Sequence, residues 1–304
     1  MQEVNQRRLR YFYNVVVSGS IRGAAEVLNT APSVITRQLR LLEQELGVKL
    51  FERDVSGSKP TEAAQFLLDY WHSSRVLIEI LEERIEETQE LKRGRVFVAL
   101  SEGFLDDFVD NVLMRFNRDF PKIELAVNVL SVGEIVEQVA SDIVHIGIVF
   151  NPPNTPHIKP FLHANVPIRL FASTEHPLAK SKGPVTVAEA LRYPIATMPH
   201  IFGLGRLTEL LAESERTSAN VVFTSNSARS IAHFIRNGTA VSFLGSRHVV
   251  AEFGDTTLAA IEVKHPLLEG NYANVVARAE RTPTKAMSTL IDYIARYSEI
   301  FGAP

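Results

Sequence analysis

Apolar residues recur at helical spacing in successive short stretches at the start of the chain. The first stretch covers residues 9–16 and ends before Gly19. The second covers residues 21–28 and follows Ser20, whose hydroxyl can accept a hydrogen bond from a free backbone N–H at a helix start. Because apolar positions separated by three and four residues share one face of a helix, both stretches are predicted to be amphipathic helices.

A third amphipathic stretch begins at Pro32 and ends at Gly47. Proline suits the first position of a helix, where no backbone N–H is needed. In the preceding stretch, the small residues Ala24 and Ala25 allow another helix to approach closely. A helix, a tight turn and a second helix form the helix-turn-helix pattern. In that motif the second helix enters the major groove and presents its first residues to base edges.

The polar face of the third stretch carries hydroxyl and guanidinium groups, from Ser33, Thr36, Arg37 and Arg40. Short hydroxyl side chains can reach bases or phosphates, and arginine can bind guanine through two hydrogen bonds or hold a phosphate. The spacing by itself is equally typical of an ordinary helical hairpin with a solvated basic face.

A strand, a turn and a second strand are predicted directly after the third helix. Residues 48–53 indicate a strand, residues 54–58 a turn, and the next helix is capped by Thr61. A strand–loop–strand element in this place is a wing. Arg53 and Lys59, at its two ends, are placed for phosphate contacts, which position a protein on DNA without reading its sequence.

The distribution of charge favours a polyanion at this end of the chain. Residues 1–60 contain nine Lys and Arg against six Asp and Glu, a net charge of +3, whereas the whole chain of 304 residues carries −3. A basic end on an acidic body suggests a localised contact with a polyanion. We therefore expect contacts with double-stranded DNA from Arg22, Pro32, Ser33, Thr36, Arg37, Arg40, Arg53 and Lys59.

Residues 61–92 contain neither proline nor glycine, which predicts one long helix. Residues spaced by threes and fours form a seam typical of helix–helix pairing: Leu67, Tyr70, Ser74, Leu77, Leu81, Arg84, Thr88 and Leu91. The opposite face carries six glutamates, which repel one another in a lone helix. We expect a second copy of the chain to bury the seam. The expected dimerisation residues are Tyr70, Leu77, Leu81 and Leu91. Packing against the chain's own body is the alternative.

The last two hundred residues alternate short apolar runs with amphipathic stretches. Strands are expected at 96–100, 123–130, 145–150, 168–172, 195–197, 220–223, 240–243 and 275–277. Helices are expected at 104–120, 133–140, 187–191, 206–212, 228–237 and 283–301. This alternation predicts an α/β fold with largely parallel sheets.

The N-terminal motifs resemble the start of the LysR-type transcriptional regulators. The matching segments are Leu9-Arg10-Tyr11-Phe12, Gly19-Ser20, Ala24-Ala25, residues 36–43, residues 45–53 and Thr61-Glu62-Ala63. The chain departs from the family pattern at Ala31, Pro32 and Ala64. The C-terminal half is similar to the family's two-lobed effector domain, which has the type 2 periplasmic-binding-protein fold. Its matching segments are residues 94–96, 116–121, 145–148, 176–179 and 237–241.

The resemblance implies an all-α winged helix-turn-helix head, a linker helix that pairs two heads, and an effector-binding α/β domain. The implied boundaries are 1–60 for the head, 61–92 for the linker helix and 94–304 for the effector domain, with lobe I at about 94–162 and 270–304 and lobe II at about 163–269. Two paired heads fit the two half-sites of a partly palindromic operator. A homodimer is implied, and a homotetramer is frequent in the family.

Ligands of open α/β sheets bind beyond the carboxyl ends of the strands, where helix N-termini favour anions. Residues that share this position are the candidate effector contacts: Ser101, Ser131, Phe150, His200, Ile201, Phe202, Asn226 and Ser227. By the resemblance, Ser101 aligns with the family's effector-contacting Ser or Thr. The fold suggests a small-molecule effector such as a small carboxylate or an aromatic acid. Glu102, Asp106 and Asp107 are interpreted as complementing a helix N-terminus.

Several functional classes are disfavoured by the residues that the chain lacks. It contains no cysteine, which excludes disulfides, thiol catalysis and cysteine-based metal sites. Its nine histidines never fall at metal-protease spacing. Gly203-Leu204-Gly205 is half of a dinucleotide fingerprint, interpreted as a helix-entry turn. We therefore expect no metal, no cofactor and no enzyme activity.

A membrane location is also disfavoured. The first ten residues are polar and basic, unlike a secretory leader. The apolar runs are far shorter than the ~20 residues that span a bilayer. A cytoplasmic, DNA-binding regulator is thus the leading hypothesis. A solute-binding receptor for transport and an α/β enzyme are the alternatives, and both leave the first ninety residues unexplained.

Overall fold

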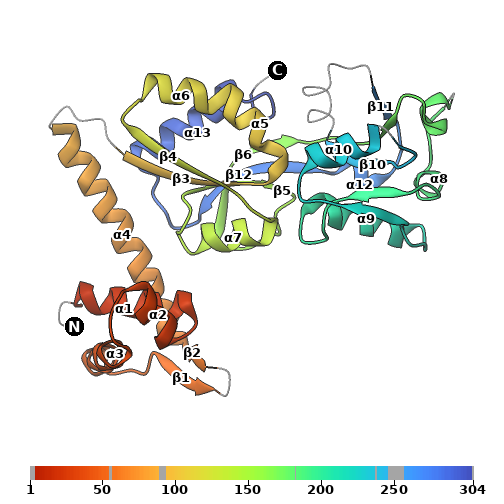
Figure 1. Cartoon of the computed structure of the whole chain (residues 1–304). Coiled ribbons are helices and arrows are strands. Elements are labelled where there is room, and N and C mark those ends of the chain that lie inside the picture. The colour runs from red at the N-terminus through yellow and green to blue at the C-terminus, as the bar shows by residue number, and fades with distance from the viewer. Residues whose placement is uncertain are drawn as a thin grey trace. The chain divides into compact units, whose positions relative to one another are not determined.

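A computed structural model describes residues 4–54, 57–88, 94–181, 183–236, 238–245 and 257–302. The chain divides into two compact units, Met1–Glu82 and Glu83–Pro304. Figure 1 shows the elements of both units, coloured along the chain.

The first unit is a helix-turn-helix followed by a two-stranded wing and the start of a long helix. Its elements are α1 (Gln6–Ser18), α2 (Ile21–Val27), α3 (Pro32–Leu46), β1 (Phe51–Asp54), β2 (Gly57–Pro60) and α4 (Glu62–Thr88). The predicted helix stops are confirmed, since Gly19 and Gly47 adopt the left-handed backbone (φ 64° and 70°) that glycine tolerates best. The predicted cap is also confirmed, because the N–H of Gly23 donates to Ser20 Oγ at 3.0 Å.

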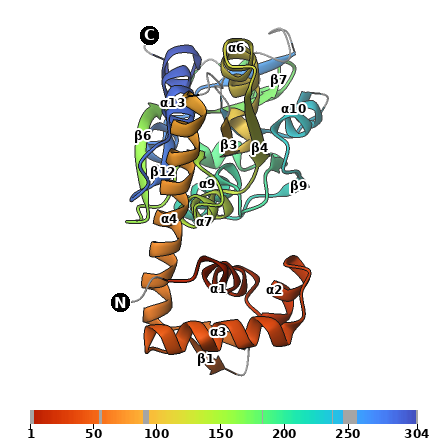
Figure 2. The same cartoon turned by 90° about the vertical axis from the view of Figure 1, so that its left-hand side faces the viewer.

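The apolar face of each helix in this unit meets the others in one core. Fully buried side chains include Leu9, Phe12, Ile35, Leu42 and Leu50. Each such side chain stabilises the fold by about 1.5–3 kcal/mol relative to an exposed one. Figure 2 shows α1 and α2 on the same side of α3. The wing is an antiparallel pair, which confirms the predicted strand–loop–strand, although β1 begins three residues later than expected.

The second unit contains two lobes. Lobe I is built on a five-stranded sheet in the order β4-β3-β5-β12-β6. Its strands are β3 (Gly94–Leu100), β4 (Ile123–Val129), β5 (Ile146–Phe150), β6 (Ile158–Asn165) and β12 (Tyr272–Arg278). Its helical segments are η1 (Glu102–Phe104), α5 (Leu105–Asp107), the π-helical η2 (Phe108–Leu113), α6 (Met114–Asp119), α7 (Val132–Ala140) and α13 (Lys285–Tyr297). Figure 1 shows α6 and α13 on one face of this sheet and α7 on the other.

Lobe II is built on a three-stranded sheet, β10-β7-β11, and a two-stranded sheet, β8-β9. Its strands are β7 (Ile168–Ser173), β8 (Ile195–Thr197), β9 (Val221–Thr224), β10 (Ser242–Gly245) and β11 (Leu258–Ile261). Its helices are η3 (Pro177–Lys180), α8 (Val187–Ala190), α9 (Gly203–Ser214), α10 (Ala228–Arg236) and α12 (Pro266–Glu269). One apolar core of buried residues runs through both lobes.

The expectation of largely parallel sheets is wrong for the three-stranded sheet of lobe II and for part of the sheet of lobe I. β10 and β11 both run antiparallel to β7, and β12 runs antiparallel to β5 and β6. Only β3, β4 and β5 in lobe I and the β8–β9 pair form parallel ladders among the named strands. Alternation of strands and helices predicts that each helix connects two parallel strands of one sheet. This chain instead passes between the lobes after β6 and again before β12. These passages bring strands into the sheets in the opposite direction.

Candidate DNA-binding surface and effector cleft

The start of α3 lies open on the surface of the first unit. Its N-cap residue, Ala31, provides no side-chain hydrogen bond, and Pro32 occupies the first turn. A shallow hollow along the exposed face of the helix is lined by Ser33, Thr36, Arg37, Arg40, Leu41 and Gln44. These residues are spaced by one, three and four positions, so they share one side of α3. The Thr36 hydroxyl donates to the Pro32 carbonyl at 2.9 Å.

The eight predicted DNA contacts fall into three groups. Ser33, Thr36, Arg37 and Arg40 line the hollow on α3, and Pro32 is exposed beside them. Arg22 is exposed on α2, and Lys59 is exposed on β2. Arg53 belongs to β1, but its side chain lies outside the described part of the structure.

Other polar residues fix α3 to its neighbours. Arg8 donates to Gln38 Oε1 at 3.2 Å and forms an ion pair with Glu45. The Glu43 carboxylate accepts from the Leu50 N–H at 2.9 Å, which ties the helix to the wing.

Three exposed arginines of this unit have no oppositely charged partner among the described residues. Arg22, Arg37 and Arg40 have no ion pair within the described residues. Unneutralised guanidinium groups around the start of a helix suit the phosphates and guanine edges of DNA.

An apolar stripe on α4 is also exposed. Phe66 is 68% exposed, Tyr70 46%, Leu77 67% and Leu81 56%. Their spacing of four, seven and four residues is that of a helix–helix seam. Phe66 was not among the residues predicted from sequence, although its spacing from Tyr70 could have revealed it. Leu91, which was predicted, lies outside the described residues.

A small apolar cavity lies between the lobes of the second unit. It is lined by Ser101, Glu102, Gly103, Phe104, Val132, Phe150, Val166, Ile168, Met198, Phe202, Gly203, Leu204 and Gly245. Its volume is about 40 Å³, space for a few water molecules. Three predicted effector contacts, Ser101, Phe150 and Phe202, belong to this lining.

Two contacts define the walls of the cavity. The Ser101 hydroxyl accepts from the Phe150 N–H at 3.3 Å, which joins the ends of β3 and β5. The Phe150 ring packs against Gly203 at the start of α9 so closely that a Cβ at Gly203 would lie 2.4 Å from it. The aromatic ring of lobe I therefore covers the first turn of a lobe II helix.

The other five predicted effector contacts lie outside this lining. Ser131 is the buried N-cap of α7, and its Oγ lies 2.6 Å from the Glu134 carboxylate in a capping box. These hydrogen bonds hold the pKa of Glu134 below its usual value. His200 borders a separate hollow, and Ile201 is 55% exposed. Ser227 accepts from the Ser230 N–H at 3.3 Å at the start of α10, and Asn226 is exposed.

Glu102 is the charged residue among the lining residues that were not predicted as effector contacts. Its Oε1 accepts from the Ala228 N–H of α10 at 2.9 Å, so the side chain connects the two lobes. The predicted role of complementing a helix N-terminus is thus seen at Glu102, on a helix 126 residues away. Burial raises the pKa of Glu102 above its usual value, while the hydrogen bond from Ala228 acts in the opposite direction.

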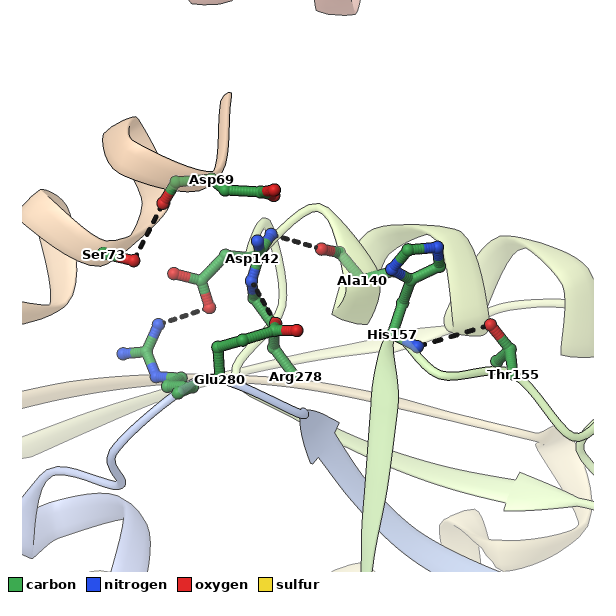
Figure 3. Close-up of polar contacts among 9 residues, drawn as sticks. Asp69, Ser73, Ala140, Asp142, Thr155, His157, Arg278 and Glu280 are labelled. Carbon is green, nitrogen blue, oxygen red and sulfur yellow. Dashed lines mark hydrogen bonds and ion pairs between the residues drawn. The ribbon is translucent and has the colours of Figure 1, made fainter. Parts of the chain in front are cut away.

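A polar cluster stabilises lobe I at the end of α7. Arg278 donates to the Ala140 carbonyl at 2.6 Å and pairs with Glu280 at 3.3 Å (Figure 3). Arg281 donates to Asp142 at 2.5 Å in a buried ion pair. Nearby, burial and the charge of Arg281 lower the pKa of His145 to about 3. In the described ranges, no group of three His, Asp or Glu side chains is placed to hold a metal ion.

A winged helix-turn-helix with an open basic helix face, followed by a long helix and a two-lobed α/β unit with a cavity, defines a ligand-responsive DNA-binding regulator. Residues 6–65 match the model of the bacterial regulatory helix-turn-helix protein, lysR family, and residues 89–299 match the LysR substrate binding domain. The chain belongs to the LysR-type transcriptional regulators, a family of DNA-binding regulators with an effector-binding domain and not of enzymes.

Individual relatives match nearly the whole chain. The HTH-type transcriptional regulator CbbR of Xanthobacter flavus is 26% identical over 296 residues, which cover 97% of this chain and 88% of that protein. The HTH-type transcriptional activator CmpR of Synechocystis sp. is 23% identical over 300 residues, 98% of this chain and 97% of that protein.

Solved structures of low sequence identity share the fold. A full-length OxyR variant from Pseudomonas aeruginosa aligns with a TM-score of 0.69 at 15% identity, over 99% of this chain and 97% of that chain. Full-length CbnR in a complex with its target DNA aligns with a TM-score of 0.51 at 20% identity, over 96% and 99% of the two chains. Within the described ranges, none of the helices has both the length and the apolar character that crossing a membrane requires.

Proposed function

We propose that this regulator recognises a specific double-stranded operator through the exposed face of α3. The observation that carries the proposal is that Arg37 and Arg40, which form no ion pair with the described residues, lie beside Ser33 and Thr36 on one side of α3. In a helix-turn-helix, this is the part of the second helix that meets base edges.

The remaining predicted contacts are assigned to the phosphates. Arg22 on α2 and the wing residues Arg53 and Lys59 hold the head on the backbone, while Pro32 sets the start of α3. Contacts of this kind fix register and orientation, and base contacts then select the sequence.

A second copy of the chain is the proposed partner for the α4 seam of Phe66, Tyr70, Leu77 and Leu81. Burial of each large apolar side chain contributes about 1.5–3 kcal/mol, so the seam favours a homodimer. The dimer places two heads on two half-sites, and two dimers form the proposed homotetramer. The target is chromosomal DNA, so the proposed site of action is the cytoplasm.

A small-molecule effector is proposed to bind in the cleft between the lobes and to alter the geometry of the DNA heads. The ligand must favour one arrangement of the assembly over another to have this effect. The assignment is supported by Ser101, Phe150 and Phe202, which line one cavity. Ser131, His200, Ile201, Asn226 and Ser227 remain proposed contacts of a wider, open cleft. The alternative of a solute-binding receptor gives no role to the basic face of α3.

Operator binding tests the proposal directly. The full-length protein should bind DNA taken from upstream of its own gene, and its affinity should fall steeply as salt rises because phosphate contacts release counterions. Fluorescence anisotropy with this DNA and a scrambled duplex of equal length measures both specificity and salt slope. Equal binding to both duplexes, or binding that salt does not weaken, would contradict the proposal.

A further inference from the structure

The cavity between the lobes has an unusual charge for a site expected to bind an acid. Among the described residues, Glu102 is its single charged lining residue, and no lysine, arginine or histidine contributes to that lining. The rest of the wall is apolar apart from Ser101 and backbone groups. An anionic ligand here would meet the Glu102 carboxylate, while the cation that acts on this carboxylate, Arg229, lies outside the lining.

Three helix starts near the cavity are covered by the protein's own side chains, whereas Ser101, at the start of the short turn η1, forms no side-chain capping hydrogen bond. The first turn of α10 receives the Glu102 carboxylate through the Ala228 N–H. The start of α7 is closed by the capping box of Ser131 and Glu134. The start of α9, at Gly203, lies beneath the Phe150 ring.

Glu102 also presents an acceptor that lacks a donor. Its Oε1 is occupied by Ala228, whereas its Oε2 is buried and no hydrogen bond of normal geometry reaches it from the described residues, although the Ser227 side chain lies close enough to lower the pKa of the carboxyl. A buried acceptor without a donor costs about 1–3 kcal/mol, and more when it is charged. A ligand that supplied a donor in the cavity would remove this cost. Burial also raises the pKa of Glu102 above its usual value, because the charged carboxylate is poorly solvated there.

We propose that the cleft selects a small ligand with a primary amine, or more weakly a hydroxyl, on an apolar body, and that Glu102 excludes carboxylates. The donor meets Glu102 Oε2, and the apolar body lies against Phe150 and Phe202. This inference rests on the effector role proposed for the cleft. Glu102 follows β3 and accepts a hydrogen bond from α10. A ligand bound to its second oxygen would therefore alter the side chain that joins the two lobes.

Three probes with the same isopropyl group separate the ligand classes: isobutylamine, isobutanol and isobutyrate. Ligand-observed NMR titration of the full-length protein should give saturable binding in the order amine, alcohol, acid. The amine should bind at least about tenfold more tightly than the acid, a difference of about 1.4 kcal/mol. Isobutyrate binding as tightly as isobutylamine, or the absence of saturable binding by all three probes, would overturn the proposal.

The variant Glu102→Gln should reverse the ligand preference and so tests the role of this side chain. Its amide oxygen still accepts from Ala228, but an NH₂ donor replaces Oε2, so the preference should shift from the amine to the acid. Glu137→Gln, which removes the same charge from an exposed position on α7, should keep the wild-type order. An unchanged order in Glu102→Gln overturns the assignment to this side chain. If that variant fails to fold, the wild-type order still decides the ligand class.

A parallel measurement of operator binding separates this inference from the proposed function. An amine that binds through Glu102 without changing the affinity or footprint of the protein on DNA contradicts the effector role of the cleft and supports the ligand class. An acid that binds in the cleft and changes the DNA complex supports the effector role and overturns the ligand class.

Discussion

The two units of this chain differ in where the charged and apolar groups that could bind a partner lie. The first unit leaves unmatched groups on its surface, namely the arginines of α3 and the apolar seam of α4. The second unit places buried charged groups against internal partners, as in the contacts of Glu102 Oε1 with Ala228 and Arg281 with Asp142, and leaves Glu102 Oε2 for a ligand. The first unit is therefore completed by partners, DNA and a second copy, while the second unit responds when a ligand alters contacts that already exist.

The largest expected effect lies in the α4 seam. Leu77→Asp places a charge where we expect a second copy to pack, and a dimer contains the change twice. Loss of about 1.5–3 kcal/mol per side chain should lower dimer stability by about 3–6 kcal/mol. Sedimentation velocity should show dissociation at concentrations where the wild type is a dimer. Gln65→Asp, on an exposed position of the same helix, is the matched control and should leave the assembly intact.

The next effect concerns the open arginine face of α3. Arg37→Ala should weaken operator binding by about 1–3 kcal/mol if the guanidinium makes a bidentate base contact. A phosphate contact would instead weaken all duplexes uniformly and reduce the salt slope by about one. Arg192→Ala, an equal change of charge at an exposed position in lobe II, should retain wild-type binding in fluorescence anisotropy. Wild-type affinity in Arg37→Ala would remove this residue from the DNA surface.

The cleft allows a test of internal packing. Gly203→Ala would bring a Cβ to 2.4 Å from the Phe150 ring, which forces the ring to move. Overpacking of this kind costs about 1–3 kcal/mol, so thermal unfolding should show a less stable second unit. At Gly183 a Cβ meets no atom within 4 Å, and Gly183→Ala should be close to neutral. Equal stability of the two variants would show that the lobes are not closed on each other through Phe150.

The sequence predicted the first unit better than the second for a physical reason. Caps and stops such as Ser20, Gly19 and Gly47 act within a few residues, so a local pattern determines them. Strand direction in lobe II depends on where the chain crosses between lobes, which no local pattern records. β6, β11 and α12 were not predicted, since each is short or polar and takes its place from neighbours distant in sequence.

The candidate sites show the same division. The basic residues of α3 are read from one helical face, and the structure places Ser33, Thr36, Arg37 and Arg40 together. The cavity combines residues from six or more separate segments of the chain. Of these residues, the sequence pattern indicated only Ser101, Phe150 and Phe202. Glu102 was assigned to a helix start, but its partner Ala228 is 126 residues away and could not be identified from sequence spacing.

The smallest effect tests how firmly the second unit keeps a titratable group buried. Burial and the charge of Arg281 lower the pKa of His145 from 6.5 to about 3, so the folded protein keeps this imidazole neutral. Below pH 6.5 the unfolded chain binds a proton that the folded chain does not. The free energy of unfolding therefore falls as the pH falls from about 6.5 toward 3, by about 1.4 kcal/mol per pH unit.

His145→Asn keeps an acceptor near the Phe97 N–H, which lies 3.4 Å from Nδ1 in the wild type, but it cannot take up a proton. Urea unfolding at pH 7.5 and at pH 5.5 should therefore show a smaller loss of stability in this variant than in the wild type, by about 1.4 kcal/mol. His157→Asn, at an exposed position, should keep the wild-type difference. A pH response in His145→Asn equal to that of the wild type would mean that lobe I admits a proton or water to this imidazole. The contrast between an open first unit and a second unit that keeps its charged groups buried would then fail at this position.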